Sequence, residues 1–161
     1  MSAVAETITY AERWSDAAGG PVDELGEDEA RRRHESGELY VAVLGGDERP
    51  RAYVEARLEK GFVGVHFLDE DGRNTVTYVF GREDDDERMF LQRATWRDFA
   101  ADGEVARGES YTFKRDGTIY VESKDYVTRE ASRGEKKDDV SSNWEPVPAF
   151  GEYDSIARLE R

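Results

Sequence analysis

The stretch that decides the fold is residues 39–80, LYVAVLGGDERPRAYVEARLEKGFVGVHFLDEDGRNTVTYVF. Runs of strand-forming residues flank Lys60-Gly61, a dipeptide that favours a two-residue hairpin turn because glycine tolerates a positive φ. A turn at this position defines which side chains face one another across the two strands. The predicted pairs are Leu58 with Val63, Ala56 with Val65, Val54 with Phe67, Arg57 with Gly64, Glu55 with His66, and Tyr53 with Leu68.

A second turn signal, Asp71-Gly72, follows eleven residues later and is a favoured type I′ dipeptide. A slip of one residue would move every side chain of a strand to the opposite face of the sheet. Both turns place apolar residues against apolar residues, and this agreement supports the register. The second turn predicts the pairs Phe67 with Val76, Val65 with Tyr78, and Val63 with Phe80.

The two hairpins together sort the side chains of this stretch onto two faces of one antiparallel layer. One face is apolar and should lie in the core. The predicted core face consists of Val54, Ala56, Leu58, Val63, Val65, Phe67, Val76, Tyr78 and Phe80. The predicted opposite face carries Tyr53, Glu55, Arg57, His66, Leu68, Thr75 and Thr77.

The strongest candidate site in the sequence is a row of Glu55, His66 and Thr77 across three strands of the opposite face. A carboxylate beside a histidine raises the pKa of the imidazole and fixes its orientation, which is how a general base is often held. These three residues are the catalytic candidates, and with Tyr53 and Arg57 they form the predicted binding site. The alternative is an ordinary polar pair on a half-covered sheet. That alternative is favoured, since the sequence places no evident nucleophile nearby.

Outside this stretch, residues 27–36 have the pattern of a short helix, with acidic residues first, basic residues last, and Gly37 as a stop signal. A third hairpin is predicted at Asp116-Gly117. Further strands are expected at residues 39–44, 89–96 and 126–130. The third turn predicts the pairs Phe113 with Tyr120, Thr112 with Val121, Lys114 with Ile119, Tyr111 with Glu122, and Glu109 with Lys124.

The predicted fold is α+β and mostly β, within one domain of residues 1–161. Residues 1–37 form an N-terminal segment with the short helix. Residues 38–130 form one antiparallel meander sheet of about seven strands, which is either open or curled into a partly closed barrel. Residues 131–142 are polar and charged, and are expected to form a loop. Residues 143–161 contain Trp, Phe, Tyr, Ile and Leu, so we expect them to pack on the sheet as a covering segment.

Composition narrows the classes of function. The chain has a formal net charge of −14, which repels nucleic acid and anionic membranes and attracts basic partners. It has no cysteine and two histidines, which excludes disulfides, thiolate nucleophiles and Cys- or His-rich metal sites. The start of the chain has neither a basic region nor an apolar run, so no signal peptide is expected. We expect a cytoplasmic protein without a cofactor or a bound metal.

Two functional hypotheses follow. The first is a non-enzymatic acidic protein that binds a basic protein partner, such as an immunity- or antitoxin-type inhibitor, with charge steering the encounter. Tyr53, Arg57, Trp96 and Tyr111 are residue types favoured at such interfaces, provided that they share one face. The alternative is a protein that binds, and in a stronger version transforms, a small molecule in a barrel-like pocket around His66.

Overall fold

The computed structural model describes residues 6–46, 48–83 and 87–161, and shows a mostly β fold with one short helix near the N-terminus. The sheet has eleven strands, more than the seven or so expected. The strands are β1 (Ile8–Ser15), β2 (Gly20–Leu25), β3 (Tyr40–Leu44), β4 (Ala52–Arg57), β5 (Phe62–Leu68), β6 (Asn74–Gly81), β7 (Arg88–Phe99), β8 (Val105–Phe113), β9 (Thr118–Asp125), β10 (Ala131–Lys137) and β11 (Trp144–Pro146). The helix is α1 (Glu27–Ser36), and the 3-10 turns are η1 (Leu58–Lys60) and η2 (Ser141–Asn143).

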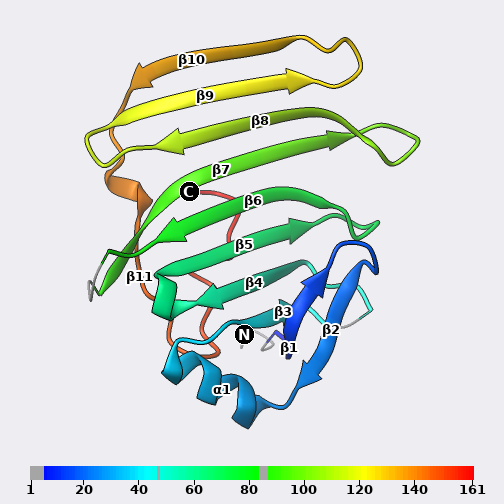
Figure 1. Cartoon of the computed structure of the whole chain (residues 1–161), viewed down its shortest axis with the longest axis vertical. Coiled ribbons are helices and arrows are strands. Elements are labelled where there is room, and N and C mark those ends of the chain that lie inside the picture. The colour runs from blue at the N-terminus through cyan, green and yellow to red at the C-terminus, as the bar shows by residue number, and fades with distance from the viewer. Residues whose placement is uncertain (1–5, 47, 84–86) are drawn as a thin grey trace, which may run out of the picture.

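Ten strands lie side by side in the order β2-β1-β3-β4-β5-β6-β7-β8-β9-β10, and β11 pairs with β7 (Figure 1). From β3 to β10 each strand pairs with the next one in the chain, which confirms the predicted antiparallel meander. α1 connects β2 to β3, and β1 lies between these two strands. The sheet is neither closed nor strongly curled, because β2 and β10 remain at opposite edges. The alternative of a partly closed barrel is therefore wrong.

The connection between β4 and β5 is longer than the predicted two-residue turn. Leu58–Lys60 forms η1, so β4 ends earlier than expected. The register is shifted by two residues as a result. Glu55 faces Gly64 rather than His66, and His66 faces Tyr53. The predicted direct pair of Glu55 and His66 is wrong, although a shift of two residues keeps each side chain on its predicted face.

The register of the second hairpin is confirmed. Phe67 faces Val76, Val65 faces Tyr78, and Val63 faces Phe80. The turn itself is longer than the predicted two-residue turn, and a register shift after Phe67 absorbs the difference. The strand pairs beyond that irregularity are therefore those that the sequence predicted.

The division of the sheet into two faces is also confirmed. Val65 is fully buried, whereas the neighbouring His66 lies on the opposite face. All members of the predicted core face belong to or pack against the main hydrophobic core, including Leu58, which lies in η1. The side-chain alternation in the sequence thus specified the faces even where the turn length was wrong.

The register of the third hairpin differs from the prediction by one residue. The Lys114 amide donates to the Thr118 carbonyl, so three residues rather than two form the turn. Each residue of β8 therefore faces a different residue of β9 than expected, which makes all five predicted pairs wrong. The observed pairs are Phe113 with Ile119, Thr112 with Tyr120, Tyr111 with Val121, Ser110 with Glu122, Glu109 with Ser123, and Gly108 with Lys124.

The predicted polar loop at residues 131–142 is wrong over its first half, because Ala131–Lys137 forms β10. Every residue of β10 is exposed. An edge strand without a buried face has no apolar alternation, so the sequence carried no signal for it. Residues 126–130, predicted as a strand, form the preceding turn, in which the Asp125 carboxylate accepts hydrogen bonds from the amides of Val127 and Thr128.

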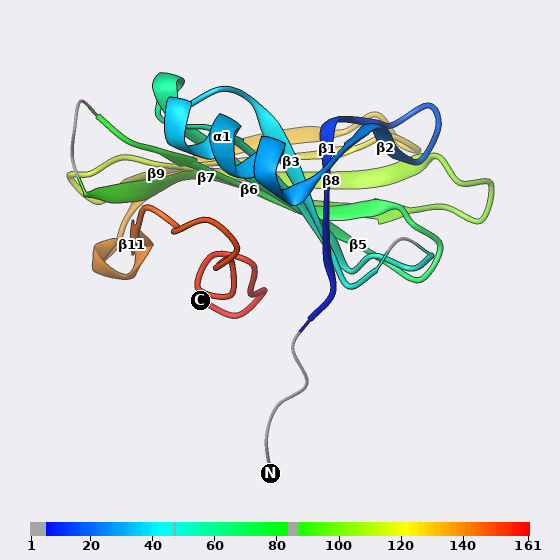
Figure 2. The ribbon, with the colours of Figure 1, turned by 90° about the horizontal axis from the view of Figure 1, so that it is seen from below.

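The C-terminal segment packs on one face of the sheet, as predicted (Figure 2). Tyr153 and Ile156 are almost completely buried against the side chains of the central strands. The Tyr78 hydroxyl donates a hydrogen bond to the Leu159 carbonyl, with 2.6 Å between the oxygens. We call this side of the sheet the covered face and the other side the open face.

A buried ion-pair cluster fixes the end of the covering segment. Glu145, on β11, is 5% exposed. Its carboxylate lies 2.7 Å from the Arg161 guanidinium and 3.0 Å from that of Arg158, and it accepts a hydrogen bond from the Ser155 hydroxyl. Burial opposes ionisation, but these three donors outweigh it and lower the pKa of Glu145. The cluster joins the last residue of the chain to the sheet.

A second polar cluster joins α1 to the same segment. The Tyr40 hydroxyl lies 2.9 Å from the Tyr153 hydroxyl and 2.8 Å from Nδ1 of His34, which is on α1. Burial raises the pKa of Tyr40 to about 12 and lowers the pKa of His34. Both shifts favour neutral side chains, so the cluster acts as a hydrogen-bonded part of the core.

Candidate functional site

The candidate site on the open face is built around a stack of three rings. The Tyr53 ring lies between Trp14 and His66, with centroid distances of 4.1 and 4.4 Å and near-parallel planes. His66 faces Tyr53 directly across β4 and β5. Trp14 reaches the stack from the outer part of β1, beyond the last residue that pairs with β3. Burial raises the pKa of Tyr53, so its hydroxyl remains protonated.

Glu55 contacts His66 along a diagonal between neighbouring strands. Its Oε1 atom lies 2.6 Å from Nε2 of His66, but without the alignment of a hydrogen bond, so the contact is electrostatic. Gly64 makes this contact possible, because it faces Glu55 and has no side chain. A Cβ atom on Gly64 would lie 3.3 Å from Nε2 of His66 and 3.0 Å from the Phe62 ring. The predicted association of Glu55 with His66 is therefore present, with a different geometry.

The other ring nitrogen of His66 belongs to a hydrogen-bond chain. Nδ2 of Asn74 donates to Nδ1 of His66 over 3.0 Å, since an amide nitrogen can only donate. The Thr77 hydroxyl donates to Oδ1 of Asn74 over 3.2 Å, and Arg97 donates to the Thr77 hydroxyl over 3.1 Å. Thr77 faces His66 across β5 and β6, as predicted. The hydrogen-bond chain runs from Arg97 on β7 to His66 on β5, and the electrostatic contact of His66 extends it to Glu55 on β4.

This arrangement limits the chemistry that His66 can perform. An Nδ1 atom that accepts a hydrogen bond places the proton of the neutral imidazole on Nε2. Nε2 is shielded from solvent and faces the Glu55 carboxylate. Both nitrogens are thus engaged within the protein, whereas a general base needs a nitrogen that reaches the proton it abstracts. The geometry is that of a packed polar cluster.

The predicted binding residues differ in their access to solvent. Tyr53 and Thr77 are buried, at 3% and 8% exposure, and contact other side chains of the cluster. The side chains of Glu55 and Arg57 are 31% and 47% exposed, and Arg57 forms an ion pair with Glu59. A partner at this site would therefore touch Glu55 and Arg57, of which Glu55 contacts His66 in the ring stack.

The four predicted interface residues do not share a face. Trp96 and Tyr111 pack edge to face, with centroids 5.4 Å apart, and Trp96 also contacts Tyr78 of the main core. They lie on the covered face, whereas Tyr53 and Arg57 lie on the open face. A single interface made of all four residues is excluded by this geometry.

A groove of about 640 Å³ continues the open face from β6 to β10. Its lining includes Thr77 at the end of the hydrogen-bond chain, but not Tyr53, Glu55 or His66. The other lining side chains are mostly small hydroxyl residues and long basic residues. Among them are Thr95, Ser110, Arg93, Arg97, Lys124 and Arg133.

Sequence reasoning missed Asn74, Arg97 and the contact of Trp14. Arg97 lies just beyond the strand predicted at residues 89–96, but β7 continues to Phe99. The alternation of Arg93, Thr95 and Arg97 with apolar neighbours was the available signal for the longer strand. Trp14 carried no comparable signal, because its position depends on how the β1–β2 hairpin lies over the sheet.

The described residues contain no group of three or more His, Asp or Glu side chains that could hold a metal ion. In the same part of the chain, no helix has the length and apolar character needed to cross a membrane. Fold alone does not define an activity, so the function has to be argued from the surfaces described above. Comparison with known proteins finds no matching family model, no matching curated protein and no matching solved structure.

Proposed function

We propose that this protein is a non-enzymatic interaction protein that binds a basic protein partner, in the manner of an immunity- or antitoxin-type inhibitor. The net charge of −14 would attract such a partner as it approaches and raise the rate of encounter. The engaged nitrogens of His66 support a binding role over catalysis. Placement in the cytoplasm is part of the same proposal.

The observation that carries the proposal is an acidic corner formed by the end of β2 and the first turn of α1. We define the acidic corner as Asp23, Glu24, Glu27 and Asp28, all of which are exposed. Among the described cations, only Arg31 lies within ion-pair distance of any of them, 3.9 Å from Glu27. Most of this negative charge is therefore available to a partner rather than neutralised within the protein.

The acidic corner is connected to the ring stack through the β1–β2 hairpin, in which Trp14 faces Pro21 and the corner begins two residues further along β2. β1 connects directly to β2 and carries Trp14 onto Tyr53, so the corner and the ring stack belong to neighbouring elements (Figure 1). A partner that contacts both would combine steering by charge with contacts to Glu55, which lies against His66 of the rigid ring stack.

The experiment is affinity capture from host lysate on the immobilised protein, at 50 and 500 mM salt, followed by purification of the captured protein and measurement of its Kd. We expect a basic protein whose binding weakens at the higher salt concentration, since screening reduces charge attraction. The Glu24→Gln, Asp28→Asn double variant should bind more weakly, mainly through a slower association rate.

The matched control removes the same charge at the opposite edge of the sheet, with Glu130→Gln and Glu135→Gln beside and on β10. Both residues are exposed. This control should keep most of the affinity if the acidic corner is the docking site. An equal loss of affinity in both double variants would refute the acidic corner as the docking site. Capture of no salt-sensitive basic protein would refute the proposed function.

A further inference from the structure

The open-face groove has a floor of small polar side chains. Thr77, Thr95 and Ser110 face one another in sequence across β6, β7 and β8. The hydroxyl oxygens of Thr95 and Ser110 are 3.2 Å apart. Gly108 also lines the groove, and a Cβ atom there would meet nothing closer than 3.7 Å. The groove is hollow because small residues occupy its centre while longer ones surround it.

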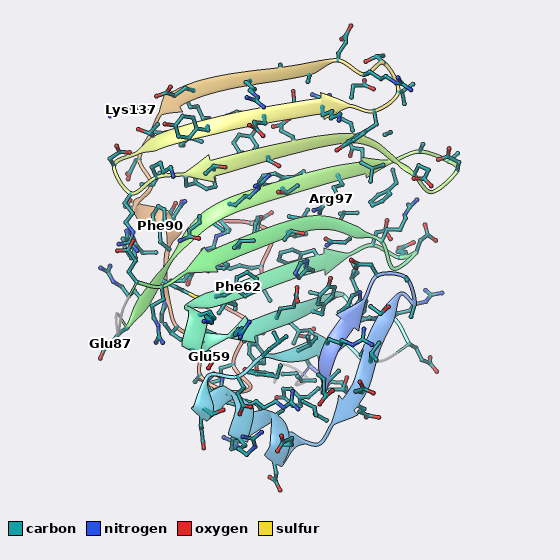
Figure 3. All side chains as sticks on the ribbon, viewed as in Figure 1. Glu59, Phe62, Glu87, Phe90, Arg97 and Lys137 are labelled. Carbon is teal, nitrogen blue, oxygen red and sulfur yellow. The ribbon has the colours of Figure 1, made fainter. Side chains whose placement is uncertain are left out.

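The residues that surround this floor are basic. Arg93 and Arg97 lie two residues before and after Thr95 on β7, so all three point to the open face. Figure 3 labels Arg97 on this strand. Lys124 and Arg133 line the side of the groove formed by β9 and β10. The one carboxylate in the lining is that of Glu122, which is 3.6 Å from Arg133.

Three of these cations have no carboxylate partner among the described residues. Arg97 donates to the Thr77 hydroxyl over 3.1 Å, and Arg93 makes a long contact of 3.5 Å with Ser110. The ammonium of Lys124 lies 4.9 Å from the centre of the Tyr126 ring. The protein has far more acidic than basic residues, so carboxylates are abundant. Three unpaired cations in one groove therefore leave positive charge and N–H donors free for a ligand.

We propose that this groove binds a small multivalent oxyanion, such as an organic polyphosphate or polycarboxylate. Arginine offers paired N–H donors that match phosphate and carboxylate oxygens, and hydroxyl groups can complete the hydrogen bonds. The volume of about 640 Å³ lies within the range of small-molecule sites. This inference concerns a different surface from the acidic corner and does not depend on the proposed protein partner.

The spacing of the two arginines indicates the shape of the ligand. Four residues along a strand place the Arg93 and Arg97 backbones about 13 Å apart. Anionic groups at two ends of a ligand could therefore each meet one guanidinium, with a polar middle over Thr95 and Ser110. A compact anion in the groove senses these nearby charges more than the distant acidic residues, because charges beyond about 8–10 Å are largely screened at physiological salt.

The test is isothermal titration calorimetry with tripolyphosphate and, separately, citrate, on the full chain at fixed ionic strength. We expect saturable one-site binding of at least one probe, and the better probe identifies phosphate or carboxylate as the preferred group. The Arg93→Gln, Arg97→Gln double variant should raise the Kd at least tenfold. Thr95→Glu, which places a carboxylate between the two guanidinium groups and keeps them, should abolish binding.

The matched control is Arg13→Gln, since Arg13 is exposed on β1 and is not part of the groove lining. It should leave the Kd unchanged within twofold. The proposal is overturned if neither probe binds the unaltered protein, or if Arg13→Gln weakens binding as much as the groove variants do. Circular dichroism of each variant establishes that a lost signal does not come from unfolding, and Thr95→Glu provides an answer if the double variant unfolds.

Discussion

The covered and open faces of the sheet arise from alternate residues of the same strands, but different interactions dominate on each face. On β5, Val63, Val65 and Phe67 point into the core beneath the C-terminal segment. Their neighbours Gly64 and His66 take part in the polar cluster of the open face. The covered face stabilises the fold by extensive apolar burial, whereas the open face combines a smaller packed cluster around Tyr53 with a groove of charged and hydroxyl side chains. Substitutions should therefore reduce stability most on the covered face, less in the packed cluster of the open face and least in the groove.

The largest expected effect is on the covered face. Tyr153→Ala removes an almost fully buried aromatic ring and leaves the Tyr40 hydroxyl without one of its partners. We expect a loss of about 3–5 kcal/mol in the free energy of unfolding, measured by urea denaturation. Tyr153→Phe keeps the ring and should lose only about 1–2 kcal/mol. Similar losses for the two variants would show that the hydroxyl, and not the packing, holds the segment.

Glu145→Gln is expected to cost about 3 kcal/mol, because it leaves the Arg161 guanidinium buried without its counter-charge. The effect should depend on pH. The folded state lowers the pKa of Glu145 below its ordinary value of 4.5, so this stabilisation is present above that pH and is lost as the pH falls below it. The difference in Tm between the two proteins should shrink from pH 6 to pH 3. A constant difference would mean that the carboxylate does not contribute through its charge.

Trp14→Ala tests the part of the open face that is packed. It removes one outer ring of the stack on Tyr53, and Trp14 is partly exposed. We therefore expect a loss of about 2 kcal/mol, below that of a fully buried aromatic residue. Trp14→Phe keeps an aromatic ring on Tyr53 and should recover part of the lost free energy of unfolding. Urea denaturation followed by circular dichroism measures both, and a loss as large as that of Tyr153→Ala would remove the distinction between the two faces in this region.

The smallest effect is expected in the groove. Thr95→Ala removes a hydroxyl group that contacts Ser110 on a solvent-facing surface. The change in the free energy of unfolding should stay within about 0.5 kcal/mol. Thermal unfolding of Thr95→Ala beside the unaltered protein measures it. A loss above 2 kcal/mol would show that the open face contributes to the fold in the same way as the covered face.

The same contrast explains how much of the molecule could be predicted from its sequence. Apolar alternation on β4, β5 and β6 was enough to assign Val65 to the core and His66 to the opposite face. The dipeptides Lys60-Gly61 and Asp116-Gly117 do not determine the number of residues in their turns, because the same dipeptide also occurs within longer turns. The predicted cross-strand partner of Glu55 was therefore wrong by two residues, and that of Thr112 was wrong by one residue.

The candidate site was predictable in part. His66 and Thr77 do face each other, and Glu55 reaches His66 only because Gly64 leaves room. The ring stack could not be foreseen, since it depends on the path of the β1–β2 hairpin over the sheet. The groove could not be foreseen either, because two of its cations, Lys124 and Arg133, come from strands whose pairing was mispredicted or unrecognised.

The two outermost strands of this wide sheet have a consequence for self-association. Both present unpaired backbone groups, which are templates for strand addition by another molecule. Every residue of β10 is exposed, including Lys136 and Lys137, and β2 begins with Gly20 and Pro21. The ammonium groups of the two lysines repel those of another copy, and the tertiary amide nitrogen of Pro21 cannot donate a hydrogen bond. Both features discourage continuation of the sheet into a fibril. The composition of the two edge strands thus opposes edge-to-edge association of this ten-strand layer with further copies of itself.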